Sequence, residues 1–419
     1  MADKSRTWRQ WWNKIGPGII TGASDDDPSG ILTYLQVGVV MGVRGLWLAL
    51  LTLPLMSAVQ EMCARLGLIT GQGLLSLIKR RYNPWLVKVV AVVAVAVIVF
   101  NIGADLLAIG VVVERLVGWP RELWIILTSA VIIIFTLKFS YRQLANFLKW
   151  LTLSLFFYVA VALSIHLNWS ELFLHTIRPQ LNFNITEIML IAAVFGTTIS
   201  PYLFFWQASE EVEEREESII KRSLKRFTVT KQGLKNLRQD TILGMSLSNL
   251  IMWFIIASAA TLASRYNLNS LETFDQAALV LEPLLGQQAY LAFATGIVGT
   301  GLLAIPVLAG SVGYILSETF GWQEGMAKPF HQARGFHLAI ALAVLLGLFL
   351  AVLKFDPIKM LIYTAFAYAM ITPPLIWFIL RLSSDRVLTK GHVNGWLVKV
   401  LGYLALFVSL AIVLFYLYL

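Results

Sequence analysis

Residues 16–30 read GPGIITGASDDDPSG and lie inside the first of a series of long apolar segments. Proline lacks a backbone donor and glycine tolerates non-helical dihedrals, so Gly16-Pro17-Gly18 and Asp27-Pro28-Ser29-Gly30 predict an interrupted helix. A second stretch, residues 196–202, reads GTTISPY and predicts a second interruption. Unpaired backbone groups at membrane depth are tolerated only where they line a cavity or bind a solute. The two breaks therefore predict where the chemistry of this chain takes place.

The composition is that of an all-α membrane protein. Of the 419 residues, 58% are hydrophobic and only 14% are charged, with a mean hydropathy of +0.73, whereas soluble domains carry about 25% charged residues. Apolar runs of roughly 18 to 25 residues recur, each long enough to cross a hydrocarbon core as a helix, and they predict about eleven spans. The predicted spans are residues 15–42, 45–66, 84–113, 121–137, 145–167, 188–209, 241–263, 289–317, 336–354, 358–381 and 396–418.

The distribution of basic residues predicts the topology. A formal charge of +9 can indicate a nucleic-acid partner, but most of the 33 Lys and Arg residues fall in or beside the segments that face the cytoplasm if the N-terminus lies inside. Such a bias orients membrane proteins. We therefore expect a multi-pass protein of the cell membrane, in a bacterium the plasma membrane, with a cytoplasmic N-terminus and an extracytoplasmic C-terminus. We expect no nucleic-acid partner, and no obligate protein partner is evident.

Two polar segments between the spans carry no catalytic pattern. Residues 210–240 begin with several glutamates and continue with lysines and arginines. This pattern predicts a solvated cytoplasmic connector that extends the sixth helix and meets anionic headgroups with its basic half. The amphipathic residues 271–285 predict a short helix on the extracellular face.

The sequence lacks the motifs of membrane enzymes and ATP-driven pumps. It contains no His-Glu-x-x-His for a metalloprotease, no phosphate-binding Gly-x-x-x-x-Gly-Lys-Ser/Thr and no Gly-x-Ser-x-Gly nucleophile elbow. Its single cysteine, Cys63, falls within a predicted span and excludes an internal disulfide or a cysteine-based metal cluster. We therefore expect a transporter and not an enzyme, without a resident cofactor.

The positions of the two breaks predict an inverted repeat. Five spans begin with the first interrupted helix, and five more begin with the second. Because five is odd, the second set crosses the membrane with opposite polarity. We expect one transmembrane domain over residues 1–419, with repeats at about 15–167 and 188–381 and an extra helix at about 396–418.

Three consecutive carboxylates inside a span are the strongest chemical signal in the chain. Each charged side chain costs about 2.5 to 3.5 kcal/mol at the centre of a bilayer, so such residues are functional by default. Successive helical residues point about 100° apart, and we place Asp27, which precedes Pro28, in the break as the ligand of a cation. Such a hard oxygen ligand suits Mg²⁺, Mn²⁺ or Ca²⁺. Asp25 and Asp26 line the path, cap helix ends or pair with a buried base.

The third span carries two polar residues four positions apart, Asn101 and Asp105, which share one helical face. That face is expected to turn toward the cavity. Asp105 then acts as an outer acid or as part of an ion path, or it forms hydrogen bonds between helices.

The residues of the two breaks resemble those of a known family. Gly16-Pro17-Gly18 followed by Asp27-Pro28-Ser29-Gly30, together with Ser200-Pro201-Tyr202, is similar to the NRAMP divalent-metal transporters over most of the chain. The resemblance implies the leucine-transporter-like fold, a five-plus-five inverted repeat with the substrate between broken helices 1 and 6. In ordinary members the first break reads Asp-Pro-Gly-Asn and the second Met-Pro-His. The Asp, the Asn, the Met and a carbonyl three residues before the Met bind a dehydrated transition-metal ion.

This sequence keeps only part of that ligand set. Asp27 matches the coordinating aspartate, and Thr197 takes the place of the carbonyl donor. Gly30 replaces the asparagine, Ser200 the methionine and Tyr202 the histidine. A thioether favours soft ions, so its replacement by a hydroxyl relaxes the discrimination against Mg²⁺, and a wider site leaves room for the water that Mg²⁺ retains. The pattern resembles the NRAMP-related magnesium transporter branch.

The resemblance also bears on proton coupling. The acidic pair on helix 3 that is associated with proton movement in ordinary members appears here as Ile102 and Asp105, which leaves one acid. We expect import of Mg²⁺, and also Mn²⁺, by alternating access without protons. Tyr202 and Asp105 would then line the path. The alternatives are a proton-coupled Mn²⁺/Fe²⁺ importer of the ordinary type, an amino-acid carrier of the same fold, and a membrane receptor or enzyme.

Overall fold

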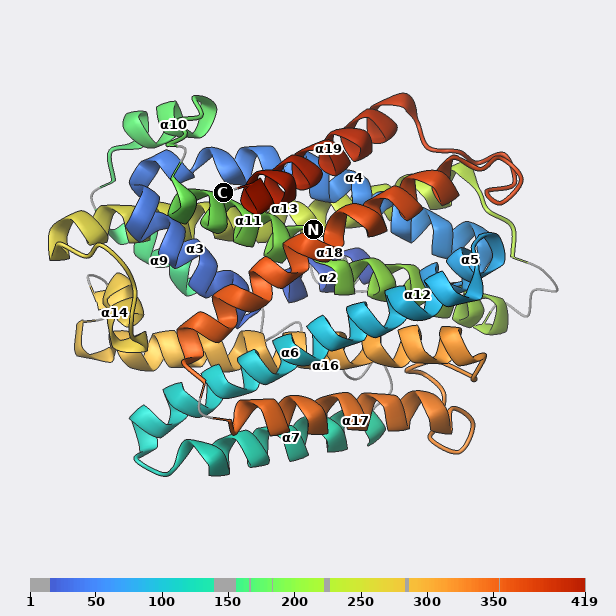
Figure 1. Cartoon of the computed structure of the whole chain (residues 1–419), viewed down its shortest axis with the longest axis horizontal. Helices are drawn as coiled ribbons and strands as arrows, with labels where there is room; N and C mark the ends of the chain where they lie inside the picture. Colours follow the sequence, from blue (N-terminus) through green and yellow to red (C-terminus); the bar gives the residue numbers. More distant parts are fainter. Residues whose placement is uncertain are drawn as a thin grey trace, which may run out of the picture.

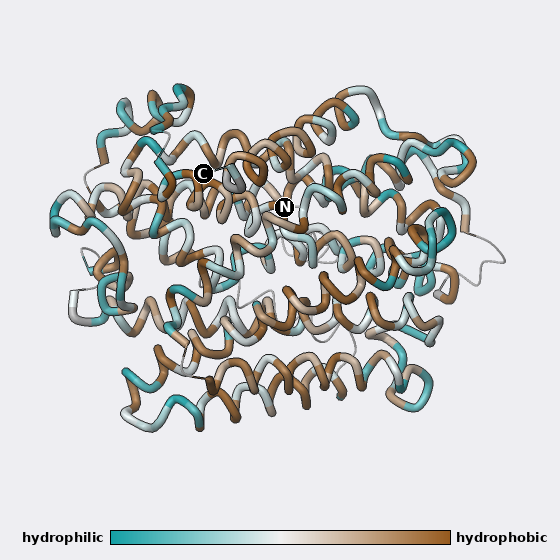
Figure 2. The backbone as a smooth tube through the Cα atoms, viewed as in Figure 1, coloured by the Kyte–Doolittle hydropathy of each residue, from teal (hydrophilic) through white to brown (hydrophobic). Residues whose placement is uncertain are grey.

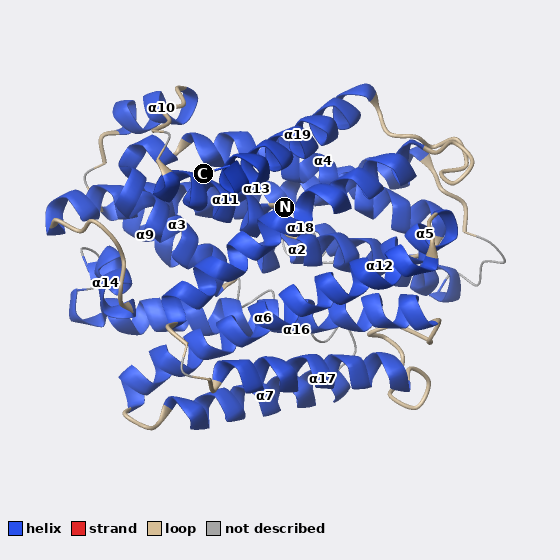
Figure 3. Ribbon diagram, in the orientation of Figure 1, coloured by secondary structure: helices blue, strands red, loops and turns tan. Residues whose placement is uncertain are grey.

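A computed structural model of the chain describes residues 16–138, 156–165, 167–182, 184–221, 227–282, 286–353 and 355–418. These residues form helices and connecting loops without a strand, as Figure 3 shows. The helices are α2 (Pro17–Asp25), α3 (Pro28–Met41), α4 (Trp47–Thr70), α5 (Leu74–Arg81), α6 (Pro84–Val117), α7 (Arg121–Lys138), α9 (Phe156–Ser164), α10 (Trp169–Ile177), α11 (Ile185–Thr198), α12 (Pro201–Lys221), α13 (Lys231–Tyr266), α14 (Phe274–Ala278), α16 (Ala289–Phe320), α17 (Arg334–Ala351), α18 (Pro357–Ser384) and α19 (Trp396–Tyr418).

The long helices run side by side along one direction, with α7 and α17 on one side of the bundle and α19 on the other (Figure 1). Hydrophobic residues dominate the middle of these helices, and hydrophilic residues gather at both ends (Figure 2). This banding is the pattern of a bundle that crosses a bilayer along its helix direction.

Eight segments of the described residues are long and apolar enough to cross a membrane. They account for eight of the predicted spans. The first predicted span is divided into α2 and α3, each too short to cross alone, and the span at 121–137 corresponds to α7, which carries three charged residues near its ends. Most of the span predicted at 145–167 lies outside the described residues. The eight crossing segments are Trp47–Thr70, Pro84–Val117, Ile185–Ile220, Lys231–Tyr266, Ala289–Phe320, Arg334–Ala351, Pro357–Ser384 and Trp396–Phe415.

The polar segments between spans differ in part from the sequence-based predictions. The sixth helix does continue into the acidic residues, since α12 reaches Lys221. The prediction of a solvated connector is wrong for Glu210 and Glu211, which are buried against neighbouring helices. The short helix predicted at residues 271–285 is confirmed as α14 and the turn that follows it.

The core places the first broken helix at the centre of the bundle. Helix α2 packs along α13 through glycines, and a Cβ atom built on Gly22 would lie 2.2 Å from the Gly244 carbonyl oxygen. Gly18 is equally close to the backbone at Thr241, with 2.7 Å from a Cβ to the nearest atom. Side chains larger than glycine cannot fit there, so these residues allow the two backbones to approach closely.

Candidate metal-ion site

The first break interrupts the helix as predicted. Helix α2 ends at Asp25, Asp26 adopts φ −86° and ψ 57°, and α3 begins at Pro28. Asp27 between them has extended dihedrals, φ −71° and ψ 171°, and it caps the N-terminus of α3. Proline suits the first position of α3 because no intrahelical partner is available for an N–H there.

The carboxylate of Asp27 is held by three donors. The Ser29 hydroxyl and the Gly30 N–H donate to its Oδ1, each at 2.7 Å. The Asn101 amide donates to its Oδ2 at 2.8 Å from the face of α6 that the sequence analysis predicted to turn inward. Asp27 is 1% exposed. The structure therefore contains a buried carboxylate that is oriented by hydrogen bonds at both oxygens.

The second break has the same backbone form as the first. Helix α11 ends at Thr198, Ile199 adopts φ −108° and ψ 57°, and α12 begins at Pro201. The Ser200 hydroxyl lies 3.2 Å from the Gly196 carbonyl oxygen and also contacts the carbonyl oxygen of Thr197. The carbonyl that the family resemblance assigns to the ion thus faces the Ser200 hydroxyl in this arrangement.

Tyr202 joins the two breaks. Its hydroxyl donates to the carbonyl oxygen of Ser24 at 2.6 Å, which satisfies one of the backbone groups left free where α2 ends. Its ring lies 5.7 Å from that of Tyr368 on α18, measured between centroids. Tyr202 therefore lies at the junction of α2, α12 and α18, in the position where ordinary members carry histidine.

Gly30 and Thr197 bring the two breaks into contact. A Cβ atom built on Gly30 would lie 3.1 Å from the Thr197 hydroxyl oxygen, 3.4 Å from the Asp25 carbonyl oxygen and 3.5 Å from Asp27 Oδ1. The space beside Gly30 is therefore narrow in this conformation, and a side chain there requires Thr197 to move. That Gly30 widens the site for a hydrated ion stays a prediction.

Asp25 and Asp26 meet the same side chain on α13. The Ser248 hydroxyl oxygen lies 3.0 Å from Asp25 Oδ2 and 3.1 Å from Asp26 Oδ1. Both residues are 0% exposed, and Asp25 Oδ1 and Asp26 Oδ2 have no hydrogen-bond partner. The ion pairs between described side chains do not include either residue, so the predicted pairing with a buried base is not found there.

Asp105 lies one turn beyond Asn101 on α6, and both its oxygens lack a hydrogen-bond partner although the residue is fully buried. It faces the backbone N–H of Ser29 at the start of α3. The positive end of a helix dipole favours an acid in that place. The Tyr368 hydroxyl faces the Asn101 side chain, so several buried polar groups gather on this side of Asp27.

The predicted residues lie in one region of the structure, but their side chains do not all point toward one position. Among the described residues, no group of three or more His, Cys, Asp or Glu side chains is arranged to hold a metal ion. This agrees with the expectation that three consecutive aspartates cannot face one ion. The sequence analysis did not predict Ser248 and Tyr368, which come from distant positions, or Tyr34, which lies about two turns along α3; none of the three belongs to a motif.

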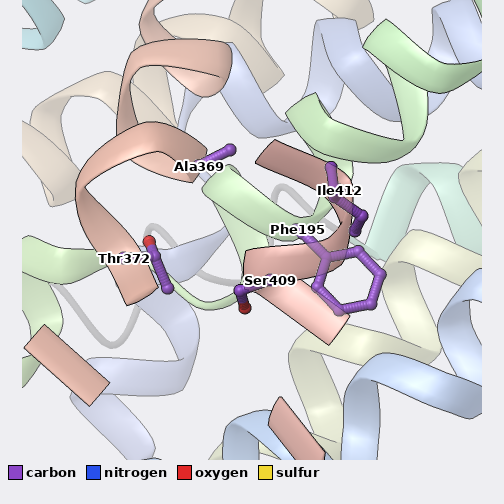
Figure 4. Close-up of a pocket in the computed structure, with 5 residues that line it drawn as sticks. All are labelled: Phe195, Ala369, Thr372, Ser409 and Ile412. Carbon is purple, nitrogen blue, oxygen red and sulfur yellow. The ribbon is translucent and has the colours of Figure 1, made fainter. Parts of the chain in front are cut away.

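A crevice near the second break is apolar and differs in character from the aspartate region. Figure 4 shows its lining, from α11, α18 and α19: Phe195, Ala369, Thr372, Ser409 and Ile412. Its volume is about 170 Å³, yet no part is wide enough for a water molecule. Its hydroxyl groups bond to backbone carbonyls, and the Thr372 hydroxyl lies 3.3 Å from the Ile199 carbonyl oxygen. The Thr372 hydroxyl thus supports the backbone of the second break, and the crevice offers no site for an ion.

Comparison with known sequences identifies related transporters. Residues 18–419 match the sequence model of the family described as natural resistance-associated macrophage protein-like. A divalent metal cation transporter of Pseudomonas aeruginosa, MntH 1, is 26% identical over 93% of this chain and 87% of its own length. The divalent metal cation transporter MntH of Mycobacterium leprae is 24% identical over 97% of this chain and 92% of its own length.

Comparison with solved structures gives the fold. The manganese transporter of Eremococcus coleocola superimposes with a TM-score of 0.74 and 15% identity, covering 98% of this chain and 87% of that chain. Mhp1, a nucleobase-cation-symport-1 family transporter, superimposes with a TM-score of 0.58 and 15% identity, covering 96% of this chain and 92% of that chain. The chain therefore has the leucine-transporter-like fold that the sequence predicted.

Proposed function

Because the chain belongs to the natural resistance-associated macrophage protein-like (NRAMP) family of multi-pass divalent-metal transporters, we propose that it carries hard divalent cations, Mg²⁺ and also Mn²⁺, by alternating access without proton coupling. Asp27 is the principal ligand in this proposal. Thr197 and Ser200 supply oxygen from the second break, and Gly30 leaves room for water on the ion.

The observation that carries the proposal is the chemistry around Asp27. The side chains and backbone groups that contact its carboxylate belong to Ser29, Gly30 and Asn101, and the second break offers hydroxyl and carbonyl oxygens. The break offers a hydroxyl, at Ser200, where ordinary members offer a thioether. Oxygen ligands suit Mg²⁺ and Mn²⁺, whereas sulfur shifts preference toward softer ions. The donors present therefore support a hard-ion site.

We infer transport without proton coupling from the chemistry of two residues. Tyr202, at the position of the histidine, has its hydroxyl committed to the Ser24 carbonyl and does not titrate near neutral pH as histidine does. Ile102, where ordinary members carry an acid on helix 3, cannot bind a proton. Asp105 is then the one acid of that pair. Each feature removes a proton carrier from the path.

The membrane potential makes uncoupled import feasible. We propose a cytoplasmic N-terminus, repeats at about 15–167 and 188–381, and residence in the cell membrane. Moving one elementary charge through 100 mV is worth about 2.3 kcal/mol, so a divalent cation gains about 4.6 kcal/mol when it enters a negative cytoplasm. The membrane potential alone can therefore drive accumulation.

The test is uptake of Mg²⁺ and Mn²⁺ into proteoliposomes that contain a pH-sensitive dye, with wild type beside Asp27→Ala. We expect uptake of both ions in the wild type, unchanged internal pH, and loss of uptake in the variant. Mn²⁺ uptake with internal acidification and without Mg²⁺ uptake would instead identify a proton-coupled importer of the ordinary type.

A further inference from the structure

The first break contains more buried carboxyl groups than one ion at Asp27 explains. We propose that Asp25 and Asp26, with Ser248 of α13, form a second binding position for a divalent cation, beside the position at Asp27. The inference rests on the proposed function, because it assigns this second position to the same transported ions. It differs in location, since it faces α13 while Asp27 faces α6.

The hydrogen bonding of the pair is incomplete in a way that a cation would complete. Ser248 contacts one oxygen of each carboxylate, at 3.0 and 3.1 Å, but a hydroxyl has a single proton to donate. When both carboxylates are ionised, one of the two contacts therefore joins two lone pairs. The remaining oxygens, Asp25 Oδ1 and Asp26 Oδ2, have no partner. A cation between the carboxylates would turn these repelling oxygens into ligands, and the Ser248 oxygen would be a third.

Burial makes ionisation of the pair costly unless a cation balances its charge. Both carboxylates are 0% exposed, and the ion pairs between described side chains leave both out. Uncompensated charges in the interior are among the costliest arrangements in a protein. One divalent cation carries the charge that neutralises two carboxylates.

A further buried hydroxyl lies next to the pair. Tyr34 of α3 is 0% exposed, and its hydroxyl has no hydrogen-bond partner. The hydroxyl lies within range of the Asp25 and Asp26 carboxyl groups and also faces the Thr197 side chain. It thus offers a free oxygen on the side of the pair that α3 lines, either to the ion or to a water that the ion retains.

The helix packing fixes this arrangement. The glycine contact of Gly22 with Gly244 brings α13 against α2, and Ser248 lies one turn beyond Gly244 on the same face of α13. The small residues thereby aim Ser248 at the end of α2. With the N-terminus in the cytoplasm, as proposed, the pair precedes Asp27 along the chain and lies on the cytoplasmic side of it. An imported ion would then reach the pair after leaving Asp27.

The test measures Mn²⁺ binding to purified full-length protein by electron paramagnetic resonance, because free Mn²⁺ gives a signal that binding removes. In Asp27→Ala, where the first position is lost, we expect one Mn²⁺ to remain bound, at reduced affinity. Adding Asp25→Asn and Asp26→Asn should abolish that binding, and adding Ser248→Ala should weaken it about tenfold or more. Ser258→Ala, which removes another buried hydroxyl of α13, is the matched control and should have no effect.

Two outcomes would overturn the proposal. Wild-type protein that binds Mn²⁺ while Asp27→Ala binds none would leave the proposed function intact and remove the second position. Residual binding in Asp27→Ala that survives the Asp25→Asn and Asp26→Asn changes would place the ion elsewhere. A wild-type protein that binds no divalent cation would reject the proposed function as well. Asp25→Asn with Asp26→Asn alone serves as the folding control, since the Asp27 position should still bind one ion.

Discussion

The two broken helices have the same backbone form and different chemistry. Asp26 and Ile199 occupy equivalent places in their breaks, each with ψ 57°, and a proline begins the helix two residues later. The first break holds three buried carboxylates, whereas the second holds hydroxyl and carbonyl groups without a charged side chain. A shared backbone break thus creates the place for a solute, while acidic side chains on one break determine that the solute is a cation.

The largest effect is expected when Asp27 of the first break is changed. Asp27→Ala removes the proposed principal ligand, and uptake of Mg²⁺ and Mn²⁺ in proteoliposomes should fall at least about 100-fold, since even residues that only support metal ligands change affinity 10- to 100-fold. Asp27→Asn keeps the shape of the side chain and removes its charge, so uptake should fall nearly as far as in Asp27→Ala. Uptake that persists in Asp27→Asn would show that geometry, and not charge, distinguishes the first break.

A smaller loss is expected when the support of Asp27 is removed. Asn101→Ala deletes the amide that holds Asp27 Oδ2, and the affinity for Mn²⁺ should fall about 10-fold. Binding is measured by titration of purified protein. Asn249→Ala is a suitable control, because Asn249 is also a buried amide but contacts Thr52 and Met56. Equal losses in both variants would mean that Asn101 acts only through stability.

Tyr202, which links the two breaks, should contribute to the thermal stability of the protein. Tyr202→Phe leaves the buried Ser24 carbonyl without its donor, which costs about 1 to 3 kcal/mol and lowers the melting temperature in detergent. Tyr368→Phe removes a hydroxyl that faces the Asn101 side chain but satisfies no backbone carbonyl, in a ring that packs against Tyr202, and should change the melting temperature much less. Similar shifts for the two variants would argue against Tyr202 as the link between the breaks.

The smallest effect concerns the contact at Gly30. Gly30→Ala places a methyl group 3.1 Å from the Thr197 hydroxyl oxygen, so Thr197 must shift and uptake should fall a few-fold, on the order of 1 kcal/mol of strain. Thr197→Ser in the same chain keeps the oxygen donor but lacks the branched methyl group that restricts its rotamer, so the hydroxyl can turn away and part of the lost uptake should return. If the double variant is no better than Gly30→Ala, the contact does not limit the site.

Much of this arrangement could be predicted from sequence, because it depends on local rules. The Asp27-Pro28 step identified the first break, Ser200-Pro201 identified the second, and the spacing of Asn101 and Asp105 predicted a common face on α6, whereas Gly16-Pro17 marks the start of α2. The resemblance to the NRAMP family was confirmed by the match over residues 18–419. These features depend on neighbours in the chain, which the sequence contains.

The rest depends on contacts between distant segments. Ser248 reaches Asp25 and Asp26 from more than 220 positions away, and the close packing of α2 against α13, as at Gly22 and Gly244, brings it there. Nothing in the sequence around Tyr202 indicates that its hydroxyl donates to Ser24. Glu210 and Glu211 were expected in solvent because acidic runs usually are, but α12 continues into the packed interior before it emerges.

The most direct test of the comparison is equilibrium binding of Mn²⁺ to two variants in parallel, Asp27→Asn from the first break and the double variant Thr197→Ala, Ser200→Ala from the second. Each variant keeps the proline of its break and removes the proposed side-chain ligands. The account predicts that Asp27→Asn binds at least about 100-fold more weakly than wild type, whereas the second-break variant loses about 10-fold or less, because carbonyl oxygens and water can replace hydroxyls around a hard ion. Equal losses in the two variants, or a larger loss in the second break, would contradict the claim that the first break alone determines the recognition of charge.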